Sequence, residues 1–187
     1  MKSAGLVLLL IFPLSAKAVF LDCAFFDGFQ AEIATAPAAW QGNLQVHNCA
    51  RKTVIPAASP VIPLMTWAND LQATAQAYAS QCNYAHSGAA GLGENIYAAA
   101  PFNATAQTDS AQDWASEQAV YDYAGNTCPV GQQCGHYTQM VWRSSLELGC
   151  GVANCTMNTP FDPVMFPNWT FVVCNYRPPG NNGNRPY

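Results

Sequence analysis

The first clear pattern in the chain is helical. Trp40, Leu44 and His47 recur at helical spacing after Pro37, a residue favoured at the first position of a helix. We therefore expect a helix from Pro37 toward Lys52.

A second helix is predicted after a proline-interrupted connection. Thr66 is positioned to cap it, and Asp70 lies near its positive end. Its apolar stripe consists of Trp67, Leu71, Ala75, Tyr78 and Cys82. The three glycines between Ser87 and Gly93 then predict a loop.

Two further helices are expected downstream. Ser110 and Asp113 have the spacing of a capping box, which predicts a third helix beginning around Ser110. A short helix is predicted over Tyr137 to Trp142.

Two runs near the end of the chain have the composition of strands. They are Leu148 to Asn154 and Trp169 to Tyr176, and a proline-rich loop separates them. Helices with a small set of strands and long loops indicate an α+β domain or a layered α/β/α domain.

Composition and charge narrow the class of protein. The chain has 187 residues, 50% hydrophobic and 10% charged, with a formal net charge of −4. Because no basic block is present, a nucleic-acid binder that neutralises phosphates is excluded. Apart from the first segment, no apolar run approaches the ~20 residues of a membrane span.

The first segment has the pattern of a secretory signal peptide over residues 1–18. Lys2 supplies the positive charge, Gly5 to Leu14 form the apolar stretch, and Ala16-Lys17-Ala18 matches a cleavage site. We expect an N-terminal extension over residues 19–39 and the main domain over residues 40–187. The expected location is secreted and extracellular, or periplasmic in a bacterium.

The chain contains 8 cysteines. An even number behind a signal peptide indicates disulfides, and no Cys-x-x-Cys pair supports a zinc-finger cluster. Spacing alone does not select among the ~105 pairings.

The candidate chemistry lies in polar residues at unusual positions. Glu117 shares a helical face with Trp114 and Tyr121, and a carboxylate on an aromatic face requires a partner. His136 opens the short helix, and His86 precedes the glycine-rich loop.

That loop leads to Glu94, which completes a set of two histidines and two glutamates. Such a set has the donor types of a zinc-class metal site. It can equally form a general acid–base pair, or a hydrogen-bonded polar cluster with no ligand.

Several linked motifs resemble the cysteine-rich secretory, antigen 5 and pathogenesis-related (CAP) superfamily. Gly135-His136-Tyr137-Thr138-Gln139-Met140-Val141-Trp142 resembles its first signature, and Phe171-Val172-Val173-Cys174-Asn175-Tyr176-Arg177-Pro178-Pro179-Gly180-Asn181 resembles its second. The segments around His86, Glu94 and Glu117 lie before these signatures, in family order. The resemblance covers about residues 40 to 187 and is closest to the plant pathogenesis-related class 1 type.

This resemblance implies an α-β-α sandwich whose cleft carries His86, Glu94, Glu117 and His136 as a divalent-metal site, usually for zinc. It also implies sterol or other lipid binding and a defence or antimicrobial role, with little support for an enzyme. A secreted metal-dependent hydrolase or protease using the same four residues is the alternative, and a structural protein-interaction domain is the third. No nucleic-acid partner is expected, and a protein partner is unknown.

The resemblance also implies disulfides that join Cys82 to Cys155, Cys128 to Cys134, and Cys150 to Cys174. Cys23 and Cys49 are then left to pair with each other.

Two regions are candidates for contact with a lipid. Tyr121-x-Tyr123 resembles half of a sterol motif found in some members of the superfamily. Phe161, Met165 and Phe166 lie in the proline-rich loop, which carries more apolar surface than a solvated connection needs. For Pro178 to Tyr187 we expect a solvated tail rich in glycine and asparagine.

Overall fold

The computed structural model describes residues 30–187. The predicted signal peptide, most of the predicted extension and Cys23 lie outside the described residues. Within the described part of the chain, none of the helices is long and apolar enough to cross a membrane.

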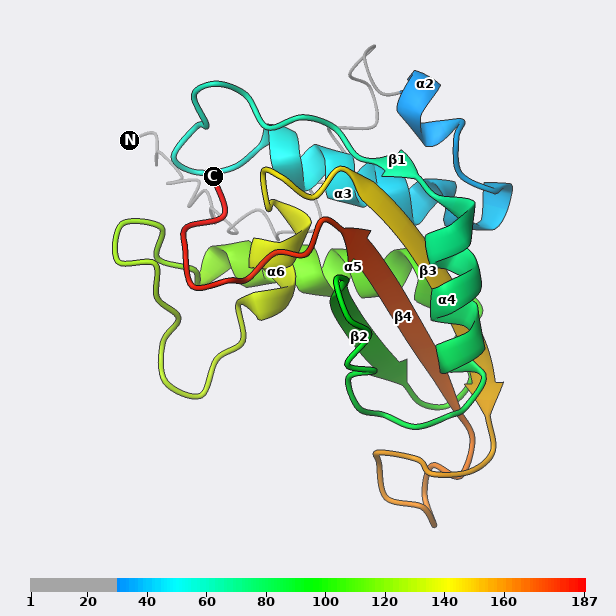
Figure 1. Ribbon diagram of the computed structural model, residues 1–187. Coiled ribbons are helices and arrows are strands. Elements are labelled where there is room, and N and C mark those ends of the chain that lie inside the picture. The colour runs from blue at the N-terminus through cyan, green and yellow to red at the C-terminus, as the bar shows by residue number, and fades with distance from the viewer. Residues whose placement is uncertain (1–29) are drawn as a thin grey trace, which may run out of the picture.

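The described chain forms a mixed set of helices and strands (Figure 1). The helices are α2 (Gln30–Ile33), η2 (Ala38–Trp40), α3 (Gln41–Lys52), α4 (Asn69–Ala79), α5 (Ala106–Ser116), η3 (Glu117–Ala119) and α6 (Gly135–Met140). The strands are β1 (Thr66–Trp67), β2 (Gly93–Ala99), β3 (Glu147–Cys155) and β4 (Trp169–Arg177).

The strands form one sheet in the order β1-β3-β4-β2. β1 pairs with β3 in parallel, while the β3–β4 and β4–β2 pairs are antiparallel. Glu94 pairs with Asn175 in this register, which places the start of β2 beside the end of β4.

Both faces of the sheet are covered, as Figure 1 shows: α4 lies on one side and α3, α5 and α6 on the other. The side chains of β4 follow this division. Phe171 and Val173 pack in the cluster that contains Ala75 and Ala79 of α4. Val172, Cys174 and Tyr176 pack with the helices of the opposite layer. The expected α-β-α sandwich is therefore confirmed.

The three disulfides implied by the family resemblance are confirmed. Cys82–Cys155, Cys128–Cys134 and Cys150–Cys174 are all formed. Cys49 is also disulfide-bonded, and Cys23, its expected partner, lies outside the described residues. The bond between Cys82 and Cys155 joins the segment after α4 to the end of β3.

The expected cap of the second helix is wrong. Thr66 belongs to β1, where its backbone N–H donates to the carbonyl of Leu146 at 3.0 Å. Helix α4 begins at Asn69 and its N-cap, Ala68, makes no side-chain capping bond. Pairing with β3 thus overrides the local capping preference of Thr66.

The expected start of the third helix is also wrong. Helix α5 begins at Ala106, and Ser110 is a buried residue inside it rather than its cap. The Ser110 hydroxyl donates to the carbonyl of Gln107 at 3.0 Å. Glu117 therefore follows the helix and opens the 3-10 turn η3.

The predicted loop before Glu94 ends earlier than expected, because Gly93 is the first residue of β2. The sequence patterns also missed β2 itself. The tail over residues 178–187 is not simply solvated: Pro186 is buried, and its carbonyl accepts the N–H of Arg143 at 2.7 Å.

Candidate functional site

The first histidine of the predicted set lies in the loop between α4 and β2. Nδ1 of His86 is 2.9 Å from Oε1 of Glu94, the second residue of β2. The same carboxylate oxygen accepts the N–H of Ser87 at 2.8 Å. The His86 side chain is 62% exposed, whereas that of Glu94 is 9% exposed. The carboxylate is therefore fixed by the sheet and orients an imidazole that faces solvent.

The second histidine, His136, forms a similar pair with Glu117. Nδ1 of His136 is 2.6 Å from Oε1 of Glu117. The other carboxylate oxygen accepts the backbone N–H groups of His136 at 3.0 Å and Tyr137 at 2.9 Å. The His136 ring also stacks on Trp114, with 5.9 Å between ring centroids. Glu117 thus accepts two backbone N–H groups at the start of α6 and orients the imidazole of His136.

These contacts determine which nitrogen of each imidazole is available. An ionised carboxylate accepts hydrogen bonds but cannot donate one, so the Nδ1 of each ring carries the proton. Nε2 then keeps its lone pair. The Nε2 lone pairs of His86 and His136 are therefore available to an electrophile or to a metal ion.

The two pairs lie on neighbouring elements. Asn95, which follows Glu94 in β2, donates from Nδ2 to the carbonyl of His136 at 3.1 Å. The side chain of Gln139 in α6 lies so close to Gly93 that a Cβ there would be 2.2 Å from its Oε1. The start of β2 and helix α6 are thus in direct contact, which carries the two histidine–glutamate pairs into one region.

A small open pocket adjoins the first pair. Its volume is about 230 Å³. Its lining residues are His86, Ser87, Gly88, Ala89, Leu92 and Glu94. The pocket gives a small molecule or water access to the imidazole of His86.

The exposed Asp113 adds negative charge beside the second pair. Partial desolvation and the nearby charge of Glu117 raise the pKa of Asp113, while His136 lowers it. The surroundings of His136 therefore contain a second carboxylate besides its hydrogen-bonded partner.

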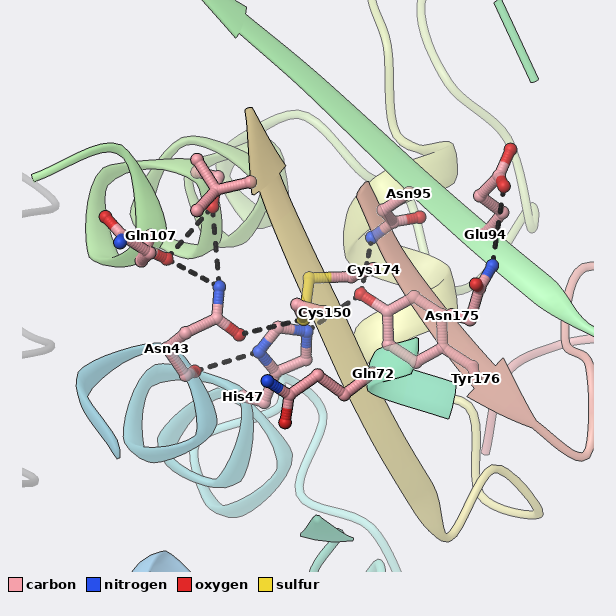
Figure 2. Close-up of a disulfide and its surroundings, with 12 residues drawn as sticks. Asn43, His47, Gln72, Glu94, Asn95, Gln107, Cys150, Cys174, Asn175 and Tyr176 are labelled. Carbon is pink, nitrogen blue, oxygen red and sulfur yellow. Dashed lines mark hydrogen bonds between the residues drawn. A yellow bond between two sulfur atoms is a disulfide. The ribbon is translucent and has the colours of Figure 1, made fainter. Parts of the chain in front are cut away.

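His47, the third histidine, lies in a buried network that its helical stripe did not predict (Figure 2). Nδ1 of His47 is 2.9 Å from the carbonyl of Asn43, and Nε2 is 2.8 Å from the hydroxyl of Tyr176. Asn95 donates to the same hydroxyl at 2.9 Å. The network thus connects α3 through β4 and β2 to the backbone of His136. The only sequence signal for it was a histidine on an otherwise apolar stripe.

The pH dependence of stability should report on this network. Burial lowers the pKa of His47 from 6.5 to about 4, opposed by its hydrogen bond with the backbone of Asn43. The unfolded chain therefore takes up this proton first as the pH falls. We expect the stabilising contribution to be complete above pH ~6.5 and to decrease by about 3 kcal/mol toward pH ~4.

Urea unfolding at pH 7 and pH 4.5 measures this loss. A His47→Gln variant has no proton to take up at this position, so its free energy of unfolding should decrease less between the two pH values. An equal decrease in the wild type and in the variant would contradict the role given to His47.

The structure places the predicted lipid-contact residues in two separate regions. Tyr121 and Tyr123 follow η3, where the Tyr121 hydroxyl donates to Asn126 and the Tyr123 hydroxyl donates to the main-chain oxygen of Tyr187. Phe161, Met165 and Phe166 lie in the loop that joins β3 to β4. The sheet register puts that loop at the end opposite Glu94.

The β3–β4 loop is a projection with apolar side chains at its surface. Val164 is 89% exposed and Met165 69%. Phe161 is partly exposed and its ring contacts that of Phe166 in an edge arrangement, with 6.2 Å between centroids. The loop therefore offers an exposed apolar surface rather than the wall of an enclosed groove.

Comparison with known proteins identifies relatives over most of the chain. Residues 44–176 match the model of the Cysteine-rich secretory protein family, CAP. "Pathogenesis-related protein 1A1" of Solanum lycopersicum is 39% identical over 171 residues, which cover 88% of this chain and 85% of that protein. "Basic form of pathogenesis-related protein 1" of Nicotiana tabacum is 43% identical over 153 residues, covering 79% and 75%.

Solved structures give the same fold. The crystal structure of NaASP2 with Zn2+ matches with a TM-score of 0.62 and 28% identity, covering 81% of this chain and 85% of that one. Venom allergen-like protein 4 of Schistosoma mansoni matches with a TM-score of 0.63 and 24% identity, covering 81% and 95%.

Proposed function

This chain belongs to the cysteine-rich secretory protein (CAP) family and is of the pathogenesis-related type, and we propose that it is a secreted binding protein with a divalent-metal site. His86 and His136 hold a zinc-class ion in this proposal. One observation carries it: each imidazole is bound through Nδ1 to a carboxylate, which leaves Nε2 free.

The donor set fits such an ion. Histidines that bind metals commonly donate their other ring N–H to a carboxylate, which fixes the ring and raises its basicity. Glu94 and Glu117 have that role here. Among the described residues, no three His, Cys, Asp or Glu side chains are grouped to hold a metal ion. The proposed site is therefore a two-imidazole site, with its remaining positions open to water or a ligand.

The surrounding residues determine what the site can do. Zinc in such a site acts as a Lewis acid. Glu117 and Trp114 hold the His136 ring from its edge and its face, and Asn95 holds the backbone of the same residue. His86 is held by one carboxylate and otherwise faces solvent. The relative NaASP2, of which one crystal structure is described as with Zn2+, supports the choice of metal.

The second part of the proposal is that the protein binds a sterol or another lipid without chemically converting it. Exposed Met and aromatic side chains of the β3–β4 loop provide a surface suited to an apolar ligand. The half-buried tyrosines after η3 are the second candidate. The pathogenesis-related names of the relatives support a defence role. The predicted signal peptide and the disulfides support the proposed secretion.

Titration with a fluorescent sterol tests the ligand class. We expect saturable binding by the wild-type protein, and weaker binding by a Phe161→Ser/Met165→Ser/Phe166→Ser variant or by a variant altered at Tyr121 and Tyr123. Glu117→Gln is the matched control, because it alters the metal region without changing either apolar surface. A peptide panel incubated with and without chelator tests the alternative.

The lipid-binding function and the hydrolase alternative predict different results in these experiments. If the protein cleaves peptides in a chelator-sensitive reaction that Glu117→Gln abolishes, the hydrolase alternative replaces the binding protein. If sterol does not bind to any form, the lipid part of the proposal fails.

A further inference from the structure

The tail over residues 178–187 crosses α6 and ends beside the connection that follows α3 (Figure 1). Its first half is attached to α6. The N–H of Gly180 donates to Gln139 at 2.9 Å, and Nδ2 of Asn181 donates to the carbonyl of Gly135 at 2.8 Å. The hydroxyl of Thr138 donates to Asn181 at 2.8 Å. These contacts lay the tail along the helix that carries His136.

Arg185 and Tyr187 are attached to the segment that contains Tyr123. The Arg185 guanidinium donates to the carbonyl of Tyr123 at 3.0 Å and lies 5.7 Å from the centroid of its ring. The Tyr187 ring stacks on the Tyr123 ring, with 4.5 Å between centroids and 21° between planes. The Tyr187 hydroxyl donates to the carbonyl of Ile55 at 3.1 Å. Tyr123 is thus covered by the tail on its face and bonded to it through its hydroxyl.

The tail also forms one wall of a cavity. Tyr121, Cys128, Cys134, Thr138 and Trp142 are among its lining residues, and Asn181, Gly183 and Asn184 line it from the tail. Its volume is about 240 Å³. Pockets that bind drug-sized molecules measure ~300–1,000 Å³. With the tail in place, the cavity is therefore too small for a sterol-sized ligand.

We propose that residues 180–187 are a latch that covers an apolar ligand site formed by Tyr121 and Tyr123. This inference rests on the proposed lipid binding and assigns it to this site. Opening the latch removes one wall of the cavity and uncovers the face of Tyr123.

The attachment combines surface contacts with a buried anchor. Arg185 and Asn181 are exposed, so their contacts lie at the surface, where segments open most easily. Pro186 is buried and its carbonyl accepts the N–H of Arg143 at 2.7 Å, so opening the last residues also breaks this bond. A ligand that binds only the open form would shift the population toward it. The latch therefore sets the apparent affinity of the site.

The test compares the full-length wild type with Arg185→Ala/Tyr187→Ala. Tyr187→Phe is the graded variant, because it keeps the stacked ring and loses the hydroxyl that donates to Ile55. Val130→Ala is the matched control, since Val130 lies in the loop joined by Cys128 and Cys134 and its side chain is fully exposed at 106%. Hydrogen exchange over residues 120–127 measures the latch, and fluorescence of bound dehydroergosterol measures the ligand site.

For the double variant we expect faster exchange over residues 120–127 and a sterol affinity raised by about five-fold or more. Tyr187→Phe should lie between it and the wild type, and Val130→Ala should match the wild type. Unchanged exchange in the double variant would overturn the latch, whatever its affinity for sterol.

Faster exchange with equal sterol affinity in every form would overturn the gating of the ligand site, while the proposed lipid binding would stand at another surface. If no form binds sterol, the proposed function and the gating both fail. Hydrogen exchange and sterol binding together thus distinguish failure of the gating from failure of the proposed lipid binding.

Discussion

Replacing Arg51 by methionine is expected to lower the free energy of unfolding by about 3–5 kcal/mol. Arg51 is 1% exposed and donates to four backbone carbonyls. Its acceptors are the carbonyls of Pro63 at 2.6 Å, Met140 at 2.8 Å, Trp142 at 2.9 Å and Arg143 at 3.3 Å. Methionine fills much of the volume but donates no hydrogen bond, so these acceptors would lose their partner.

The position of these carbonyls explains why the effect is large. They belong to the end of α6, to the residues that follow it and to the connection before β1, so one guanidinium joins three segments. Burial and the charge of Arg143 lower the pKa of Arg51 to about 9, opposed by Tyr176. The cost of burying this charge is therefore already present in the native protein and is offset by the hydrogen bonds.

Chemical denaturation of the wild type, Arg51→Met and Lys52→Met measures the difference. Lys52 is the adjacent, exposed residue at the end of α3, and its replacement should change the free energy of unfolding by no more than about 0.5 kcal/mol. Similar losses in the two variants would mean that removing a positive charge, and not the buried contacts, destabilises the protein.

The second large effect is expected at the contact between α4 and the sheet. A Cβ at Gly151 would lie 2.3 Å from the backbone N and Cα of Gln76. Both obstacles are main-chain atoms, so no side-chain rotation relieves the overlap. Gly151→Ala should therefore displace α4 from β3 and lower the free energy of unfolding by about 3 kcal/mol or more.

The displacement would also break two hydrogen bonds. The amide of Gln76 donates to the carbonyl of Val152 at 2.9 Å and accepts the N–H of Val152 at 3.0 Å. Gly135→Ala is the matched control, because a Cβ there meets nothing within 4 Å. Thermal or urea unfolding should separate the two alanine variants. Equal midpoints would show that the contact between α4 and β3 tolerates a methyl group.

Much of the fold could be predicted from the sequence. The stripe of Trp40, Leu44 and His47 correctly predicted α3, and the two apolar runs correctly predicted β3 and β4. These elements bury side chains at a regular period, and the period is visible in one segment at a time.

The errors arose where distant segments determine the local structure. Thr66 has the residue type of a cap, but it pairs with Glu147 of β3, and the carbonyl of Leu146, just before that strand, accepts its N–H. Ser110 and Asp113 have the spacing of a capping box within a helix that starts at Ala106. Strand β2 begins with a glycine and ends with two alanines, so its sequence carries little strand preference; pairing with β4 stabilises it.

For the candidate site, the sequence indicated the four residues but not their pairing. His86 and Glu94 are near one another in the chain, whereas Glu117 and His136 meet only because η3 packs near α6. The network of His47, Tyr176 and Asn95 joins three elements, so no single segment contained its pattern. Whether the carboxylates contact the imidazoles through Nδ1 was also a question of geometry alone.

Calorimetric titration of the metal-free protein with zinc at neutral pH tests the central claim, that His86 and His136 donate Nε2 to one divalent ion. We predict one site per chain, with affinity reduced at least about tenfold in His86→Ala and in His136→Ala. Wild-type affinity in both alanine variants would contradict the assignment.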